Sequence, residues 1–193
     1  MQVSVVRQPP ALHERAVALV GGDPAHPPSV PGHDLADLLP DGLVPGRGWP
    51  QPDDLVGIAT SPDGLLIVVG SHVAGGTGPI GVPDDGMLEI GYGLAPAYRG
   101  QGVATTAVGL LCADLFCDSG IRAISAEMLE GNVPSWRLVE RLGFRRRPHA
   151  ERDGHRRYVL DRPADGPARR RTSALPDHPS GRAFGRDLPG SGG

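Results

Sequence analysis

The segment from Gly86 to Ala104 constrains the fold of this chain more than any other. Its first half alternates apolar and small residues as a strand does, and a short turn follows at Ala95-Pro96. The turn leads into Arg-Gly-Gln-Gly-Val-Ala at 99–104, and a helical pattern continues to about Cys117. Free backbone N–H groups at a helix start, together with the helix dipole, attract anions, and glycines let the backbone approach them. The segment therefore predicts a phosphate-binding strand–turn–helix unit.

Two well-known phosphate-binding loops do not fit this segment. A P-loop requires Gly-x-x-x-x-Gly-Lys-Ser/Thr, and the sequence contains no lysine. A dinucleotide-binding loop requires Gly-x-Gly-x-x-Gly and an acidic residue about 20 positions on, at the end of a second strand. Here Gly100 and Gly102 lack the third glycine, and Glu127 lies inside a strand pattern. Taken alone, the two glycines equally fit an ordinary helix start.

Composition limits the kind of protein that this chain can be. Its 193 residues have the length of one domain, and 29 glycines and 21 prolines together exceed a quarter of it. No stretch approaches the roughly 18 apolar residues of a membrane span, and the N-terminus lacks a signal-peptide pattern. We therefore expect a cytoplasmic protein without membrane contact. The formal net charge of −3 gives no general attraction for nucleic acid.

The residues that commonly bind metals are not grouped in this sequence. Cys112 and Cys117 are the only two cysteines, and their spacing places them on different faces of the predicted helix. The seven histidines are scattered without metal-ligand spacing. We therefore predict neither a disulfide nor a metal site.

The hydrophobic pattern divides the chain into three parts. Residues 1–52 give weak signals, whereas residues 53–161 contain clear apolar runs. From 162 to 193 large apolar residues almost disappear, so this tail is expected to be disordered because it cannot offset the entropy of ordering. Strands are expected at 3–6, 65–70, 72–80, 87–94, 122–129 and 156–160, and helices at 12–20, 34–39, 101–116 and 132–142.

A second motif follows the strand expected at 122–129. It consists of Asn132-x-x-Ser135, an apolar helix, and Gly143-Phe144. The two motifs and the order of the elements resemble the GNAT superfamily of acyl-CoA-dependent N-acyltransferases, over residues 53–161. Glu-Ile-Gly-Tyr-Gly-Leu together with Asn-x-x-Ser is similar to the branch that includes the ribosomal-protein-alanine N-acetyltransferases.

The resemblance implies an α/β (α+β) fold with a mixed, bent central sheet and helices on both faces. Strands 87–94 and 122–129 would splay apart, with acyl-CoA entering from one side and the amine acceptor from the other. Residues 1–52 would line the acceptor side. Gly91 and Gly93 suit a bulge that opens an unpaired strand edge for the pantetheine arm.

The resemblance also assigns contacts to the co-substrate, acetyl-CoA. Backbone groups near Leu94 and Ala95 would pair with the pantetheine arm, and Asn132 would bond a pantetheine amide. The N–H groups from Gly100 to Thr105 would hold the pyrophosphate. Asn132 equally fits a plain helix cap. The full set of expected contacts is Leu94, Ala95, Arg99, Gly100, Gln101, Gly102, Val103, Ala104, Thr105 and Asn132.

Acetyl transfer requires a neutral amine and a proton for the departing thiolate. Glu89 is the candidate base because it is the carboxylate inside the strand that would line the cleft; a solvated residue or one that positions substrate fits as well. Strict alternation places it on the face of Gly91 and Gly93. Ser135 is the candidate acid, because Val139 stands where many members of the superfamily have a tyrosine. A hydroxyl that bonds its own helix backbone equally fits Ser135.

These expectations lead to an acetyl-CoA-dependent N-acetyltransferase that acts by direct attack of a primary amine, either a protein N-terminus or a small molecule. Two alternatives stay open: acetylation of an antibiotic or metabolite, and an acyl-CoA sensor or scaffold without turnover. The arginines at 145–147, with Arg156 and Arg157, suit an acidic acceptor or nucleic acid, but a solvated charge run explains them better. The sequence leaves a homodimer open.

Overall fold

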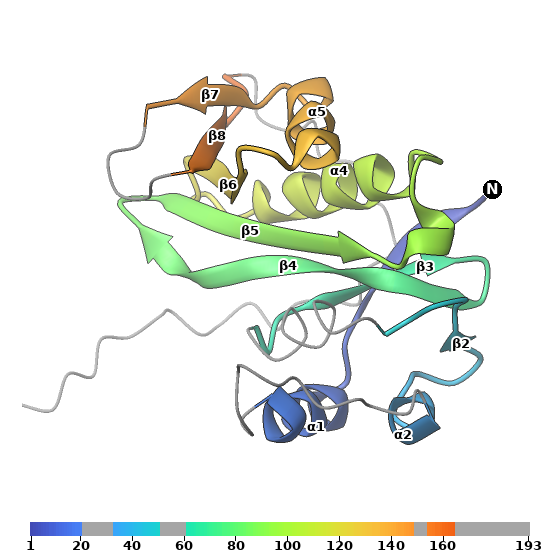
Figure 1. The fold of residues 1–193 in the computed structure, drawn as a ribbon. Helices are drawn as coiled ribbons and strands as arrows, with labels where there is room; N and C mark the ends of the chain where they lie inside the picture. The colour runs from blue at the N-terminus through green and yellow to red at the C-terminus, as the bar shows by residue number, and fades with distance from the viewer. Residues whose placement is uncertain (21–32, 51–60, 149–153, 165–193) are drawn as a thin grey trace, which may run out of the picture.

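A computed structural model describes residues 1–20, 33–50, 61–148 and 154–164 of the chain (Figure 1). The 3-10 turn η1 (Pro96–Tyr98) joins β5 to the loop before α4. The helices are α1 (Pro10–Val20), α2 (His33–Ala36), α4 (Val103–Leu115) and α5 (Val133–Arg141). The strands are β1 (Val3–Arg7), β2 (Val44–Pro45), β3 (Leu65–Val69), β4 (His72–Asp84), β5 (Met87–Leu94), β6 (Ala123–Leu129), β7 (Arg145–Arg147) and β8 (His155–Asp161).

The strands form one mixed sheet in the order β1-β3-β4-β5-β6-β8-β7, and β2 pairs with β4 beside this path. Neighbours along the path are antiparallel except β5 and β6, which are parallel. Helices α1 and α2 lie on one face of the sheet, and α4 and α5 lie on the other (Figure 1). The predicted fold, a mixed sheet with helices on both faces, is confirmed.

Each face of the sheet has its own hydrophobic core. Strand β3 contributes to both, because Leu65 and Ile67 point to the α4 and α5 side while Leu66 and Val68 point to the α1 and α2 side. A strand buried on both faces is apolar throughout, which explains the uninterrupted run that predicted it. None of the helices in the described parts of the chain is long and apolar enough to cross a membrane.

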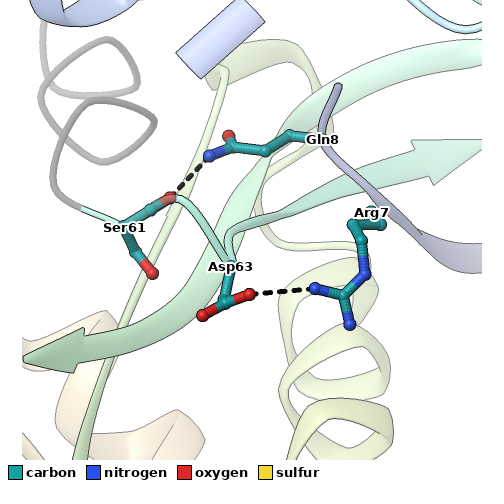
Figure 2. Close-up of polar contacts among 4 residues, drawn as sticks. All are labelled: Arg7, Gln8, Ser61 and Asp63. Atoms are coloured by element: carbon teal, nitrogen blue, oxygen red, sulfur yellow. Dashed lines mark hydrogen bonds and ion pairs between the residues drawn. The ribbon is translucent and has the colours of Figure 1, made fainter. Parts of the chain in front are cut away.

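The N-terminal residues belong to the sheet. Strand β1 pairs along its whole length with β3. Just beyond it, the Gln8 side-chain amide donates to the Ser61 carbonyl at 2.5 Å, and Arg7 forms an ion pair with Asp63 at 3.0 Å (Figure 2). These contacts fix the end of β1 to the turn that begins β3.

The C-terminal limit of the described residues falls inside the segment that was expected to be a tail. The Arg162 backbone N–H donates to the Arg122 carbonyl at 2.8 Å, and its guanidinium donates to the Phe116 carbonyl at 2.5 Å. Arg162 is therefore anchored to the domain, and the expected boundary at 162 is too early. The rest of the expected tail, 165–193, lies outside the described residues.

Strands β5 and β6 separate as the sequence predicts. They pair only from Met87 to Glu89, whose partner on β6 is Ser125. Strand β5 continues to Leu94 and stays paired with β4 throughout. Within the described residues, the edge of β5 from Ile90 to Leu94 therefore has no strand beside it on the β6 side.

The expected bulge at Gly91 and Gly93 is wrong. Both glycines pair in regular register with β4, and the register shift between β4 and β5 lies between Ile80 and Asp84. Strand β5 thus carries no extra residue at these glycines, and its edge is open because β6 diverges from it. A Cβ at Gly91 would lie 2.9 Å from the Cδ1 atom of the exposed Ile80 side chain, which would have to shift.

Candidate functional site

The loop before α4 has the backbone conformation expected of an anion site. Gly100 and Gly102 have φ values of +73° and +79°, which other residues rarely adopt, and Gly102 is the N-cap of α4. An added Cβ at either glycine would meet no atom within 4 Å, so open space lies over both. The N–H groups in the first turn of α4, those of Val103, Ala104 and Thr105, have no acceptor within the helix. The loop therefore offers backbone donors and space for an anion.

Side chains of the same loop hold its conformation. Arg99 turns back and donates its Nε to the Leu94 carbonyl at 2.8 Å, and Gln101 donates to the Ala97 carbonyl at 2.8 Å. These two residues were predicted to contact the co-substrate. In the structure, both side chains brace the loop between β5 and α4.

The open edge of β5 presents alternate backbone groups. The Ala95 N–H donates to the Ala74 carbonyl of β4 at 2.9 Å, and the Ala95 carbonyl accepts from the Tyr98 N–H at 3.0 Å. Because N–H and C=O groups alternate in direction along a strand, Leu94 and Tyr92 direct theirs away from β4. The groups that face the open edge are thus those of Tyr92 and Leu94, whereas the Ala95 N–H and carbonyl bond within the domain.

The second motif forms the N-terminus of α5. Asn132 is its N-cap, and the Asn132 Oδ1 and carbonyl oxygens accept from the Ser135 N–H at 3.4 and 3.1 Å. Ser135 itself is half-buried. The structure therefore shows Asn132 as the cap of α5. The cap uses the Oδ1 atom of the side chain, and the side-chain amide nitrogen takes no part in it.

Tyr92 joins β5 to this turn, and sequence reasoning did not single it out. Its hydroxyl donates to the Ser135 carbonyl at 3.1 Å. Burial raises the pKa of Tyr92 to about 12, and the hydrogen bond to Ser135 offsets this only in part. The alternation of side chains along the strand could have indicated this position. It places Tyr92 on the same face as the buried Leu88 and Ile90, toward α4 and α5.

Val139, which stands at the position of the usual tyrosine, is fully buried in the core on that face. No side chain from this position reaches the open edge of β5. The candidate donors near α5 are therefore the Ser135 hydroxyl and the Tyr92 phenol.

Glu89 lies on the opposite face of the sheet from Ser135. Its neighbours Leu88 and Ile90 are buried against α4 and α5, so the half-buried Glu89 side chain points to the α1 and α2 face. Gly91 and Gly93 share this face, as strict alternation predicts. The two candidate catalytic residues thus approach the gap between β5 and β6 from opposite sides.

A second carboxylate, Glu127 of β6, shares that face. It follows Ser125, the partner of Glu89, by two positions along β6, so the two carboxylates stand on neighbouring strands. Its side chain is 8% exposed and accepts from the Arg157 Nε at 2.7 Å and Nη2 at 2.5 Å. Sequence reasoning used Glu127 only to exclude a dinucleotide site; the parallel pairing of β5 and β6 was the signal that could have placed it here.

Comparison with known proteins identifies the central part of this architecture. Residues 58–145 match the acetyltransferase (GNAT) domain. The match covers a little less than half of the chain. The predicted likeness to GNAT acetyltransferases is therefore confirmed for these residues.

A curated protein aligns with part of this domain. An uncharacterized N-acetyltransferase of Bacillus subtilis (strain 168), YjdG, is 33% identical over 74 residues, which are 38% of this chain and 44% of that protein. The chain thus aligns with less than half the length of this curated relative.

Solved structures share the fold over most of the chain. Aminoglycoside acetyltransferase AAC(6')-Ib in complex with coenzyme A superposes with a TM-score of 0.55 at 17% identity, covering 83% of this chain and 95% of that one. RimL, a ribosomal L7/L12 alpha-N-protein acetyltransferase in complex with coenzyme A, gives 0.53 at 16% identity, covering 83% and 94%. At such identities the likeness establishes the fold.

Arginines of β7 and β8 line a hollow of about 440 Å³. Three of them form ion pairs: Arg147 with Asp161, Arg156 with Glu130, and Arg157 with Glu127. Much of the positive charge is thus compensated within the domain, which favours the interpretation of a solvated charge run.

The described residues bring together no group of three or more His, Cys, Asp or Glu side chains that could hold a metal ion.

Proposed function

We propose that the chain is an acetyl-CoA-dependent N-acetyltransferase that transfers an acetyl group to a primary amine by direct attack. One observation carries the proposal: the open edge of β5 lies between two helix N-termini, those of α4 and α5. The match of residues 58–145 to the acetyltransferase (GNAT) domain supports it. Both structural relatives described above are acetyltransferases solved with coenzyme A.

The residues of the loop before α4 fit the pyrophosphate of acetyl-CoA. The N–H groups from Gly100 to Thr105 would hold it, because the first turn of α4 offers donors and no Cβ of Gly100 or Gly102 obstructs the approach. The pantetheine arm would pair with the N–H and C=O groups of Tyr92 and with the N–H of Leu94, whose carbonyl accepts from Arg99. The Asn132 side chain would bond a pantetheine amide from the α5 side.

The two faces of the sheet would divide the chemistry. On the α1 and α2 face, Glu89 would take a proton from the amine, directly or through water, and Glu127 would help to hold the amine. The amine nitrogen would then attack the thioester carbonyl, and the carbon–sulfur bond would break. On the α4 and α5 face, Ser135 would donate a proton to the departing thiolate, either from its hydroxyl or through a bound water. The proton that the nitrogen loses as the amide forms would return to Ser135 through water.

The acceptor would enter on the α1 and α2 face, and two classes fit the proposal. RimL is named for acetylation of a protein N-terminus, and AAC(6')-Ib for acetylation of aminoglycosides. The half-buried Glu89 carboxylate would face an amine that arrives protonated, with Glu127 beside it held by Arg157, and either class of amine would satisfy this. We favour a protein N-terminus because the Glu-Ile-Gly-Tyr-Gly-Leu and Asn-x-x-Ser motifs resemble those of the ribosomal-protein-alanine branch.

An assay of thiol release separates turnover from binding. The chain is incubated with acetyl-CoA and a panel of amines that includes peptides with free N-termini, aminoglycosides and polyamines, while CoA binding is measured by calorimetry. Amine-dependent release of CoA thiol is expected, with peptides the best acceptors. CoA binding without thiol release from any amine would overturn the enzymatic proposal and favour a sensor or scaffold.

A further inference from the structure

The gap between β5 and β6 has two walls after their pairing ends. One wall is β5 from Ile90 to Leu94, which stays fixed because it pairs with β4. The other is the first turn of α5, which follows β6 after the short turn at Gly131-Asn132. Backbone pairing of β5 with β6 ends at Glu89 and Ser125, so it does not set the distance between these walls.

The Tyr92 hydroxyl spans the two walls directly. Tyr92 lies on the unpaired part of β5, and its hydroxyl donates to the Ser135 carbonyl in the first turn of α5 at 3.1 Å. A carbonyl oxygen accepts two hydrogen bonds, and helix geometry directs the Val139 N–H to the same carbonyl. The phenol can therefore bond this turn without taking an acceptor from the helix.

Within this turn the Asn132 carbonyl accepts from the Ser135 and Trp136 N–H groups at 3.1 and 3.3 Å, but the side-chain cap is long. The Asn132 Oδ1 atom accepts from the Ser135 N–H at 3.4 Å, near the limit for a hydrogen bond. Asn132, Val133 and Pro134 are all exposed, so packing adds little to hold this turn. In contrast, the Tyr92 ring packs against the core between the sheet and the helices α4 and α5.

Burial keeps the Tyr92 hydroxyl protonated, so that it can donate a hydrogen bond. Burial raises the pKa values of Tyr92 and of the neighbouring Cys112 thiol to about 12, so both groups are neutral at ordinary pH. The Tyr92 hydroxyl thus keeps its proton, and the Ser135 carbonyl keeps its partner, over the whole pH range in which an amine is acetylated.

We propose that Tyr92 is a positioning residue that fixes the separation between β5 and the first turn of α5, and so places Asn132 and Ser135 against the open edge of β5. The inference rests on the proposed function, because acetyl-CoA is the molecule that would lie between these walls. It assigns Tyr92 a role through its hydroxyl that differs from the proton-donor role proposed for Ser135.

The test compares Tyr92→Phe with Tyr158→Phe. Each variant removes one phenolic oxygen and keeps the ring, and Tyr158 is buried in the same core on β8, where its hydroxyl bonds Arg156. Four quantities are measured on the full chain: the melting temperature, hydrogen exchange of the first turn of α5 without ligand, the Kd for CoA, and kcat with the best amine of the panel.

Both variants are expected to melt slightly below the parent. Tyr92→Phe alone should speed exchange at Ser135 and Trp136, weaken CoA binding severalfold, and lower kcat about tenfold or more, because small misplacements at a reacting centre cost up to about 10²-fold. Tyr158→Phe should leave exchange in this turn, CoA affinity and kcat unchanged.

The outcomes separate the two proposals. If the parent binds CoA but acetylates no amine, the proposed function fails, and exchange and CoA affinity still decide the role of Tyr92. Exchange and CoA affinity in Tyr92→Phe that match Tyr158→Phe would show that the hydroxyl serves stability alone and would overturn the inference. A parent chain that binds no CoA would overturn both.

Discussion

The Arg99 side chain donates its Nε to the carbonyl of Leu94, at 2.8 Å, across the 3-10 turn that follows β5. The last residue of the open strand is thereby tied to the loop that begins α4. This bond helps to fix the spacing between the proposed pantetheine and pyrophosphate contacts. Arg99 was expected to contact the co-substrate. Its side chain instead links the two proposed parts of the co-substrate site, the edge of β5 and the loop before α4.

The first prediction concerns the glycine at the start of α4. Gly102→Ala places a methyl group in the open space over the loop and should weaken CoA binding about tenfold or more, equivalent to about 1.4 kcal/mol. Gly70→Ala is the matched control, because Gly70 also has a positive φ and open surroundings but lies in the turn between β3 and β4. Both should lose about 1–2 kcal/mol of stability from backbone strain. Equal CoA affinities in the two variants would contradict the site.

The second prediction concerns the proposed base. Glu89→Gln keeps the shape of the side chain and removes its basicity, so kcat should fall about 10²–10⁴-fold, as for other general bases. The loss should be greatest at low pH, where the amine is protonated and its deprotonation limits the rate. Rates are measured as thiol release over a pH series. A Glu89→Gln variant within about threefold of the parent, together with an inactive Glu127→Gln variant, would move the base to Glu127.

The third prediction concerns the proposed acid. Ser135→Ala removes the hydroxyl but keeps the backbone carbonyl that accepts from Tyr92, so the first turn of α5 should stay in place. We expect kcat to fall with little change in the KM for acetyl-CoA, since the hydroxyl would act mainly as the thiolate departs. Steady-state kinetics at saturating amine measure both constants. An unchanged kcat would leave proton donation to water.

Much of the fold was predictable because its signals are local. The apolar run of β3 and the Asn-x-Pro-Ser start of α5 depend only on neighbouring residues. Strand β7 was not predictable, because Arg145–Arg147 carries no apolar residue and becomes a strand only through its pairing with β8. Strand β4 runs to Asp84 where a longer turn was expected, because Asp85 and Gly86 both have positive φ and form a two-residue hairpin turn.

The residues of the candidate site also divide into those that local motifs predict and those that tertiary contacts bring together. The glycines of the loop and the Asn132 cap follow from short motifs, and the structure has them in the expected conformations. The Tyr92 bond to Ser135 joins residues 43 positions apart, and the Glu127 carboxylate reaches the face of Glu89 through the pairing of two strands. Contacts of this kind depend on tertiary structure, so local patterns do not reveal them.

The fourth prediction concerns the anchoring of Arg162. Its guanidinium donates to the carbonyls of Phe116, Asp118 and Ile121 and lies 5.2 Å from the centre of the Phe116 ring, so it satisfies carbonyls that follow α4. Arg162→Ala should cost about 1–3 kcal/mol and lower the melting temperature by about 3–10 °C. The exposed Arg145→Ala is the control and should melt with the parent. Equal melting temperatures for both would show that the anchoring adds no stability.

The last prediction follows from two buried groups that resist ionisation. Burial raises the pKa of Tyr92 from 10.0, and that of Cys112 from 9.0, to about 12 in each case. Between these values the folded chain binds more protons than the unfolded chain, so the free energy of unfolding should fall as pH rises above 9.0. Each group contributes at most about 1.4 kcal/mol per pH unit.

Below pH 9.0 both groups are protonated in both states, and their contribution to stability is fully present. Cys112→Ala should flatten the decline from pH 9.0 upward, whereas Tyr92→Phe should flatten it only above pH 10.0. Urea unfolding at a series of pH values measures the free energies. A decline with the same slope in the parent and in both variants would mean that other groups titrate in this window, and that Tyr92 and Cys112 are less buried in solution than in the structure.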